Sequence, residues 1–257
     1  MAFLFNELVY RPIYNLLIFI YNILPWHDFG VAIIFVTIII KLVLVPLSKK
    51  QIESQKKMQE LQPKLKAVQD KYKNDKEKQT KAVMEFYKEN KANPFSGCLP
   101  LIFQMVFLIA IYRVLYNISQ NGLMANSADL YAFVHNPGQI NHFFLGLVDL
   151  SGAAINFGAL NVSTVAHILL VVAAAGAQYV QTKMLMATKK EKEVVVKDKK
   201  DAKEPDFASM MSKQMLYLAP IMTLFIGIKF PAGLALYWLV STLFMIIQQK
   251  QLEKRKS

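Results

Sequence analysis

The stretch that decides the fold is residues 29–48, FGVAIIFVTIIIKLVLVPLS. It is almost wholly aliphatic, and about 20 mostly apolar residues are enough for a helix to cross a bilayer. Its single charge, Lys41, costs roughly 2.5–3.5 kcal/mol near the centre of such a span. Two interpretations are open: the side chain extends along the helix to the head groups, or it is an intramembrane cation that meets a polar group. The second is favoured, because a simple anchor would not carry that cost.

The composition excludes several classes of protein. The chain has 257 residues, of which 54% are hydrophobic, and a net charge of +12. This pairing is typical of a membrane protein with several spans and basic loops. The single Cys98 excludes a disulfide framework and a cysteine-based zinc site, and the four His residues lack metal-binding spacing. Because no nucleotide-binding or hydrolase motif is present, we expect no enzyme activity, cofactor, metal or DNA partner.

Five segments of the sequence are apolar and long enough to be spans, and their flanks predict an orientation. Residues 48–93 contain thirteen Lys against seven acidic residues, and 183–213 contain nine Lys against six, whereas 119–162 contain no Lys or Arg. Lys and Arg accumulate in cytoplasmic loops. We therefore expect the N-terminus and the loop 119–162 outside and the C-terminal tail 250–257 inside. The spans cover about residues 29–47, 98–118, 163–186, 214–230 and 232–249.

Residues 1–28 predict a helix of a different kind. Glu7, Arg11, Asn15 and Asn22 fall on one narrow stripe, and the other faces carry Phe, Leu, Ile and Tyr. This pattern is typical of a helix that lies in the membrane interface, and we expect it on the outer face. A cleaved signal and a sixth span are the alternatives. No small-residue cleavage site follows, and Pro12 shortens the apolar run.

Residues 48–93 predict a helical hairpin on the cytoplasmic side. Apolar residues recur at helical spacing among Lys, Gln and Glu, stop at KNDKEK and then resume. Two amphipathic helices that face each other explain this pattern, and a solvated spacer is the alternative. The basic surface fits anionic lipid or ribosomal RNA equally well. The apolar positions are Met58, Leu61, Leu65, Val68, Tyr72, Val83, Phe86 and Tyr87.

The middle of the chain adds weaker signals. Gln104 is an uncharged polar group in the second span, where such a residue most often joins helices. The outer loop predicts a short surface helix near HFFLGLVDL, residues 142–150. In the third span the small residues 173–177 allow close packing, and Gln178 and Gln181 follow.

The last third predicts a linker and a tight pair of spans. Residues 187–213 form a basic loop, much of it with the composition of a disordered segment. The last two spans turn at PAG, residues 231–233. The apolar run 215–230 reaches only about 24 Å, against a hydrocarbon core of about 30 Å. We therefore expect local thinning of the bilayer or tilted neighbours.

Five ordered motifs closely resemble the bacterial YidC membrane-protein insertases, which belong with the mitochondrial oxidase-assembly and chloroplast Albino-type insertases. The resemblance covers about residues 25–250. It implies an all-α membrane protein whose five transmembrane helices, residues 29–257, enclose a hydrophilic groove that is open to the cytoplasm. It also implies a mobile cytoplasmic hairpin that receives the nascent chain. The motifs are KLVLVPLSKKQ, MQELQPKLKAVQDKY, NPFSGCLPLIFQM, YVQTKML and PIMTLFIGIKFPAGLALYWLVSTLFMIIQQ.

The resemblance also implies which residues line the groove. Lys41 occupies the position of the family's groove cation, and Gln104 falls in its second-span motif. Gln181 in YVQTKM and Trp238 in LYWLVS match polar groove positions on later helices. The family usually has Arg at Lys41; Arg binds a carboxylate through two parallel bonds, whereas Lys is a point charge. Lys229 replaces a residue that is usually neutral.

These features predict an insertase and chaperone that inserts nascent membrane proteins and helps them fold without nucleotide hydrolysis. We expect the short bacterial form in a cell membrane. Its expected partners are nascent membrane-protein substrates, the translating ribosome, the Sec translocon and anionic lipids. An ion channel or transporter is one alternative, but it predicts inverted repeats or several charges along one path. A membrane scaffold is another, and it leaves Lys41 without a role.

Overall fold

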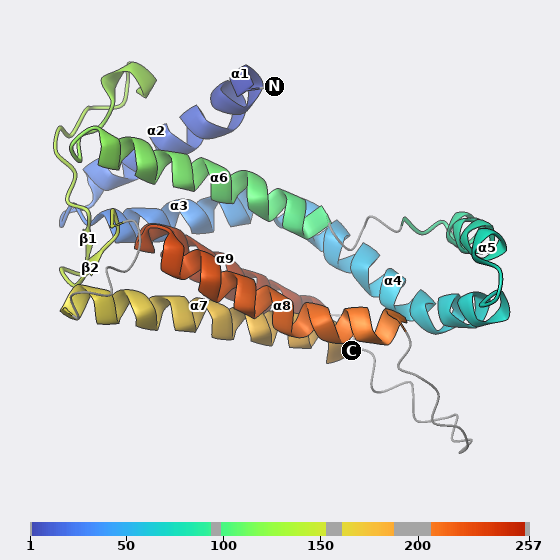
Figure 1. Cartoon of the computed structure of the whole chain (residues 1–257). Coiled ribbons are helices and arrows are strands. Elements are labelled where there is room, and N and C mark those ends of the chain that lie inside the picture. The colour runs from blue at the N-terminus through green and yellow to red at the C-terminus, as the bar shows by residue number, and fades with distance from the viewer. Residues whose placement is uncertain (1, 94–98, 153–160, 188–206, 255–257) are drawn as a thin grey trace.

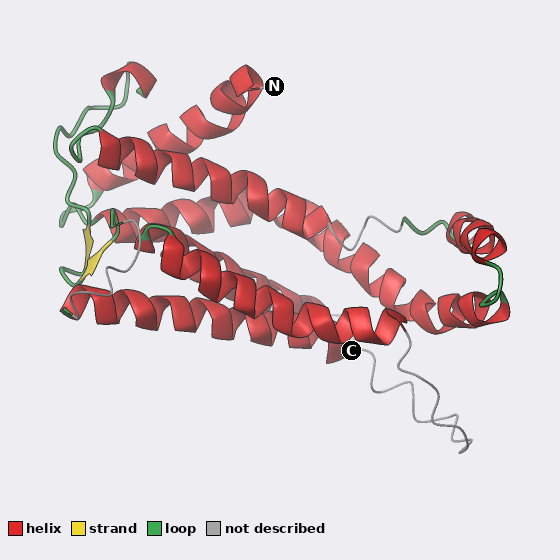
Figure 2. Cartoon of the chain, in the orientation of Figure 1, coloured by secondary structure: helices red, strands yellow, loops and turns green. Residues whose placement is uncertain are grey.

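The computed structural model describes residues 2–93, 99–152, 161–187 and 207–254, and nearly all of its regular structure is helical (Figure 2). This confirms the predicted all-α membrane protein. One short antiparallel hairpin of strands is the exception. The longer elements are α2 (Arg11–Ile23), α3 (Phe29–Val43), α4 (Val45–Lys71), α5 (Lys76–Glu89), α6 (Leu99–Gln120), α7 (Val162–Ala187), α8 (Phe207–Lys229) and α9 (Ala232–Lys254). The shorter ones are α1 (Ala2–Phe5), η1 (Asn6–Tyr10), η3 (Ser127–Asp129), β1 (Phe143–Phe144) and β2 (Val148–Asp149).

Helix α9 is the centre of the bundle. It packs against α3, α6, α7 and α8, and Figure 1 shows it between α6 and α7. The first residues of α9, from Ala232 to Tyr237, are all buried. Residues 121–152 lie at one end of the bundle, here called the loop end. The far part of α4 and α5 lie at the other, here called the hairpin end (Figure 1).

Four described helices are long and apolar enough to cross a membrane. The α3–α4 pair makes a fifth candidate if it is counted as one broken span, and Leu216–Lys229 of α8 is a shorter apolar helix. The apolar part of α8 is therefore short, as expected, although the helix itself has 23 residues. The four helices are Phe3–Ile23, Ile102–Gln120, Val162–Met184 and Ala232–Lys254.

The first predicted span, 29–47, is not one straight helix. α3 ends at Val43, and α4 leaves it at an angle of 66°. Pro46 explains the break, because it lacks an N–H and its ring clashes with the carbonyl group of the residue four positions earlier. Asp28 begins α3, and its carboxylate accepts from the Val31 N–H at 2.9 Å. The apolar run thus begins where the sequence predicts but turns before its expected end.

The N-terminal helix, formed by α1, η1 and α2, is attached to the loop end by its polar side chains. Asn15 is buried; its amide donates to the Asp129 carbonyl at 2.9 Å and accepts from the Tyr131 N–H at 2.6 Å. Asn22 donates to the His135 carbonyl at 2.6 Å. Much of the polar stripe predicted to face the interface therefore binds the loop. Phe3–Ile23 also has the length of a span, so the interfacial placement stays a prediction.

A β-hairpin stands where the sequence predicted a short surface helix near residues 142–150, so that prediction is wrong. Phe143 pairs with Asp149, and Phe144 with Val148. Three residues separate the strands, and two of them, Leu145 and Gly146, have positive φ, +52° and +69°, which interrupts any helix. The Asp28 carboxylate accepts from the Leu145 N–H at 2.7 Å, which ties the turn to the start of α3.

At the hairpin end, α4 and α5 pack against each other. The described apolar positions of the predicted stripe are half-buried, from Met58 to Tyr87. Asp75 begins α5; hydrogen bonds from the Lys78 backbone N–H and then its ammonium hold the pKa of that carboxyl below its usual range. These contacts define a helical pair, whereas its mobility and its role stay predictions.

Candidate functional site

Lys41 lies in the last turn of α3, and its ammonium group binds an uncharged side chain. Its Nζ donates to Gln104 Oε1 on α6 at 3.2 Å. Among the residues that the structure describes, no carboxylate lies within ion-pair distance of Lys41. An ammonium has three N–H donors. Lys41 therefore reaches another helix instead of only extending to the head groups, and it keeps donors for a further acceptor.

Three helices build a polar cluster around Gln104, here defined as Lys41, Gln104, Tyr237 and Ser241. Ser241 of α9 donates to the same Gln104 Oε1 at 3.0 Å. Tyr237 lies one turn earlier on α9, and its hydroxyl sits beside both residues without a hydrogen bond of ordinary geometry. Gln104 Nε2 is also buried without a partner. The cluster thus holds unused donors within an apolar bundle.

A second polar group lies on the other side of α9, where it meets α7. Trp238 Nε1 donates to Gln178 Oε1 at 3.2 Å, and Thr242 donates to the same oxygen at 3.4 Å. Thr182, one turn further along α7, donates to the Gln178 carbonyl at 2.9 Å. Gln178 therefore makes the polar contact between α7 and α9, whereas Gln181 is half-buried and has no hydrogen bond to another described residue. The place of Gln181 in the groove stays a prediction.

The spacing of the buried residues along α7 distinguishes Gln178 from Gln181. Val171, Ala174, Ala175 and Thr182 are all buried, so the face that contacts α8 and α9 recurs at spacings of three and four. Gln178 continues this series, whereas Gln181 lies about 60° around the helix from it. Ser241 and Thr242 could be found in the same way, since they follow Tyr237 and Trp238 by one turn.

The polar cluster offers hydrogen-bond donors and therefore suits a ligand that carries hydrogen-bond acceptors. A buried polar group without a partner costs about 1–3 kcal/mol. Gln104 Nε2 and the remaining donors of Lys41 would recover this cost by binding a carboxylate, a backbone carbonyl or water. The described residues include no group of three or more His, Cys, Asp or Glu side chains that could hold a metal ion.

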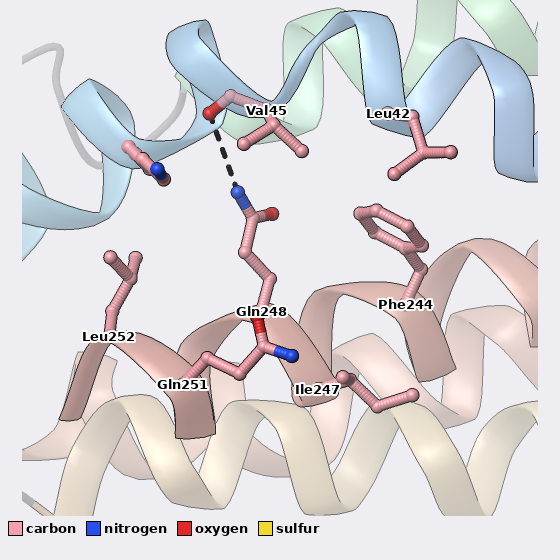
Figure 3. Close-up of a pocket in the computed structure, with 8 residues that line it drawn as sticks. Leu42, Val45, Phe244, Ile247, Gln248, Gln251 and Leu252 are labelled. Atoms are coloured by element: carbon pink, nitrogen blue, oxygen red, sulfur yellow. Dashed lines mark hydrogen bonds between the residues drawn. The ribbon is translucent and has the colours of Figure 1, made fainter. Parts of the chain in front are cut away.

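A hollow of about 300 Å³ lies between the α3–α4 break and α9 (Figure 3). Its lining differs from the predicted site residues: Leu42, Val45, Lys49, Phe244, Ile247, Gln248, Gln251 and Leu252. Gln248 Nε2 donates to Ser48 Oγ at 2.7 Å and to the Val45 carbonyl at 3.4 Å. These bonds join the break in the first span to the last helix.

A protein-family model described as "60Kd inner membrane protein" matches residues 19–257. The chain belongs to this family. A relative in Fusobacterium nucleatum, "Membrane protein insertase YidC", is 34% identical over 250 residues, which are 96% of this chain and 98% of the relative. Proteins of the same name in Geobacter metallireducens and Tolumonas auensis are 31% and 34% identical over 95% of this chain.

The family members differ in length. The chain spans 36% of the Geobacter relative and 37% of the Tolumonas relative, but nearly all of the Fusobacterium relative. The resemblance predicted from the motifs is confirmed. With these relatives and the apolar helices, the chain is a multi-pass bacterial membrane protein.

Proposed function

We propose that this protein is a membrane protein insertase, which inserts nascent integral membrane proteins and helps them fold. One observation carries the proposal: the bundle holds a cation, Lys41, whose only hydrogen-bond partner among the described residues is a neutral amide oxygen. A structural ion pair would have used that charge. The insertase relatives and the matched family model support the same assignment.

The polar cluster lowers the barrier for polar segments of a substrate. An Asp or a Lys at the centre of a helix costs about 2.5–3.5 kcal/mol to place in a bilayer, whereas Leu, Ile, Phe and Val each favour insertion by about 0.3–0.6 kcal/mol. The polar tail of the substrate receives hydrogen bonds from Lys41, Gln104 and Trp238 in place of water. Meanwhile, the apolar part of the substrate partitions into lipid. That partition drives the step, so no nucleotide hydrolysis is required.

The charge distribution supports an orientation and a set of partners. The hairpin end faces the cytoplasm, because the hairpin 48–93 holds thirteen Lys residues whereas residues 121–152 at the loop end hold no Lys or Arg. The domain division is a helix at residues 1–28 on the outer side and an insertase core at 29–257. The hairpin 48–93 receives the nascent chain from the translating ribosome and contacts anionic lipids, and the Sec translocon acts beside the core.

The decisive experiment compares acidic and neutral substrates. Wild-type protein and Lys41→Met, Lys41→Arg and Lys41→Glu variants are reconstituted in liposomes with paired single-span substrates translated in vitro. Met removes the charge and keeps the length of the side chain, so insertion of the acidic substrate falls about tenfold, as expected from the loss of one charge-assisted bond. Arg retains activity, and Glu is worse than Met on the acidic substrate.

Lys229→Met is the matched control. Lys229 is an exposed Lys at the end of α8 next to the loop end, so its loss changes net charge equally without touching the polar cluster. This variant inserts both substrates normally. Equal activity of the Lys41→Met and wild-type proteins on both substrates would remove Lys41 from the site. Ion flux through the same liposomes without substrate would instead support a channel.

A further inference from the structure

The hollow at the α3–α4 break changes character along its length. Figure 3 shows Leu42, Phe244 and Ile247 at the end nearest α3, and Leu252 at the opposite end. Lys49 lies on α4, beyond the break, and also lines the hollow. Gln248 and Gln251 project from α9 between these ends (Figure 3). The hollow is therefore apolar at the end nearest α3, and the rest of its lining includes two Gln amides and one cation.

Within the described part of the chain, no carboxylate pairs with Lys49, the cation of the hollow. No ion pair of the described residues includes Lys49, and no described hydrogen bond uses its ammonium. Glu253, the carboxylate next to the lining residue Leu252, is 3.8 Å from Lys56 and accepts a hydrogen bond from Gln249. Exposed Lys50, Lys250 and Lys254 add positive charge around the same end. Charge complementarity thus favours an anionic occupant.

The position of the hollow fits an occupant with an apolar tail. Leu42 and Val43, at the end of α3, are 55% and 71% exposed, so this surface faces hydrocarbon if the bundle spans a membrane. Lys49 follows on α4 after the break, where head groups begin. A volume of about 300 Å³ is at the lower limit for a small-molecule site. The hollow thus crosses the boundary between tails and head groups.

We propose that this hollow binds one anionic glycerophospholipid. Its phosphate accepts from Lys49 and Gln251, and part of one acyl chain lies along Leu42, Phe244 and Ile247. A zwitterionic lipid binds more weakly, because none of the lining residues is a carboxylate that could receive its ammonium. Through Gln248, which lines the hollow and binds Ser48, the lipid would hold the α3–α4 break against α9. The proposal rests on the membrane placement in the proposed function.

Lipid retention by the whole purified protein tests the proposal. The protein is exposed in detergent to phosphatidylglycerol, to phosphatidylcholine or to inorganic phosphate, and bound species are counted by native mass spectrometry. Lys49→Gln weakens phosphatidylglycerol binding about fivefold, the effect of one Lys at an anionic lipid surface. Lys50→Gln, its exposed neighbour outside the hollow, changes retention little. Ile247→Trp fills the apolar end and also reduces binding.

Three results would overturn the lipid site. The first is an equal loss of phosphatidylglycerol from the Lys49 and Lys50 variants. The second is retention of phosphatidylcholine to the same extent as phosphatidylglycerol, and the third is displacement of the lipid by inorganic phosphate. A photo-crosslinker at position 247 in vesicles that are inserting a substrate adds a further arm. Crosslinks to lipid support the site, and crosslinks to the nascent chain assign the hollow to the substrate. Because retention is measured without substrate, failure of the lipid site leaves the insertase proposal untouched.

Discussion

Removing the cation of the polar cluster should stabilise the protein while it impairs insertion. A Lys costs roughly 2.5–3.5 kcal/mol at the centre of a transmembrane helix. The bond from Lys41 to Gln104 returns about 1.5–3 kcal/mol, as a hydrogen bond to a charged group. In Lys41→Met both contributions disappear, and Gln104 Oε1 still accepts from Ser241. We therefore expect the free energy of unfolding to rise by about 1 kcal/mol.

Gln104→Leu, in contrast, should lower the free energy of unfolding. It leaves the Lys41 ammonium and the Ser241 hydroxyl without their acceptor, at a cost of about 1–3 kcal/mol, although it also removes the unpaired Nε2. With Met at position 41 the same substitution should be nearly neutral, because no charge is left unpaired. The double-mutant cycle therefore predicts a coupling energy of about 1–3 kcal/mol between the two positions.

Equilibrium unfolding by SDS in mixed micelles measures all four proteins, and the liposome insertion assay is run on the same preparations. A Lys41→Met protein that is both less stable and less active would refute the reasoning, since Lys41 would then be a structural strut. A Lys41→Met protein that is more stable but inserts acidic substrates less well would show that Lys41 destabilises the fold and is needed for activity.

Three further predictions address the frame around the site. In a Cys98→Ser background, Phe133→Cys should react with an impermeant thiol reagent from outside and Met84→Cys only after lysis; the reverse would overturn the orientation. Deletion of residues 50–90 should abolish insertion while the protein still accumulates in the membrane, and normal insertion would reduce the hairpin to a spacer. Asp28→Ala should lower the free energy of unfolding by about 2–3 kcal/mol, because the α3 cap and the acceptor of the Leu145 N–H are both lost; an unchanged SDS midpoint would contradict both roles.

The positions of the helices could be predicted because a bilayer leaves few alternatives. An apolar run must satisfy its backbone groups internally, so it becomes a helix wherever it is long enough. The break after Val43 was also encoded, since Pro46 cannot continue the hydrogen-bond ladder. The loop followed other rules: positive φ at Leu145 and Gly146, with Asp28 as an acceptor from a distant helix, produced a hairpin instead of a helix. That long-range contact has no local signature.

The candidate site was predictable by residue type but not by rotation of the helices. Lys41 of α3 and Gln104 of α6 do meet, through a hydrogen bond. On α7 the choice between two Gln residues depends on which face packs. A Cβ atom at Gly227 of α8 would lie 2.8 Å from Val171, so α7 approaches α8 closely there, and Gln178 follows Val171 by two turns on the same face. This packing involves residues far apart in the sequence.

The packing on the loop-end side of the polar cluster bears on how a substrate could use the proposed site. Between the polar cluster and the loop end, fully buried side chains such as Ile33, Val36, Ile111 and Val114 fill the space between α3, α6 and α9. Beyond them, the N-terminal helix holds the loop through Asn15 and its neighbours. A polar tail that reaches Lys41 from the hairpin end therefore meets a packed apolar core and has no continuous polar path ahead. Under the proposed function, we therefore expect the substrate to leave by lateral movement into lipid rather than by passage through the bundle.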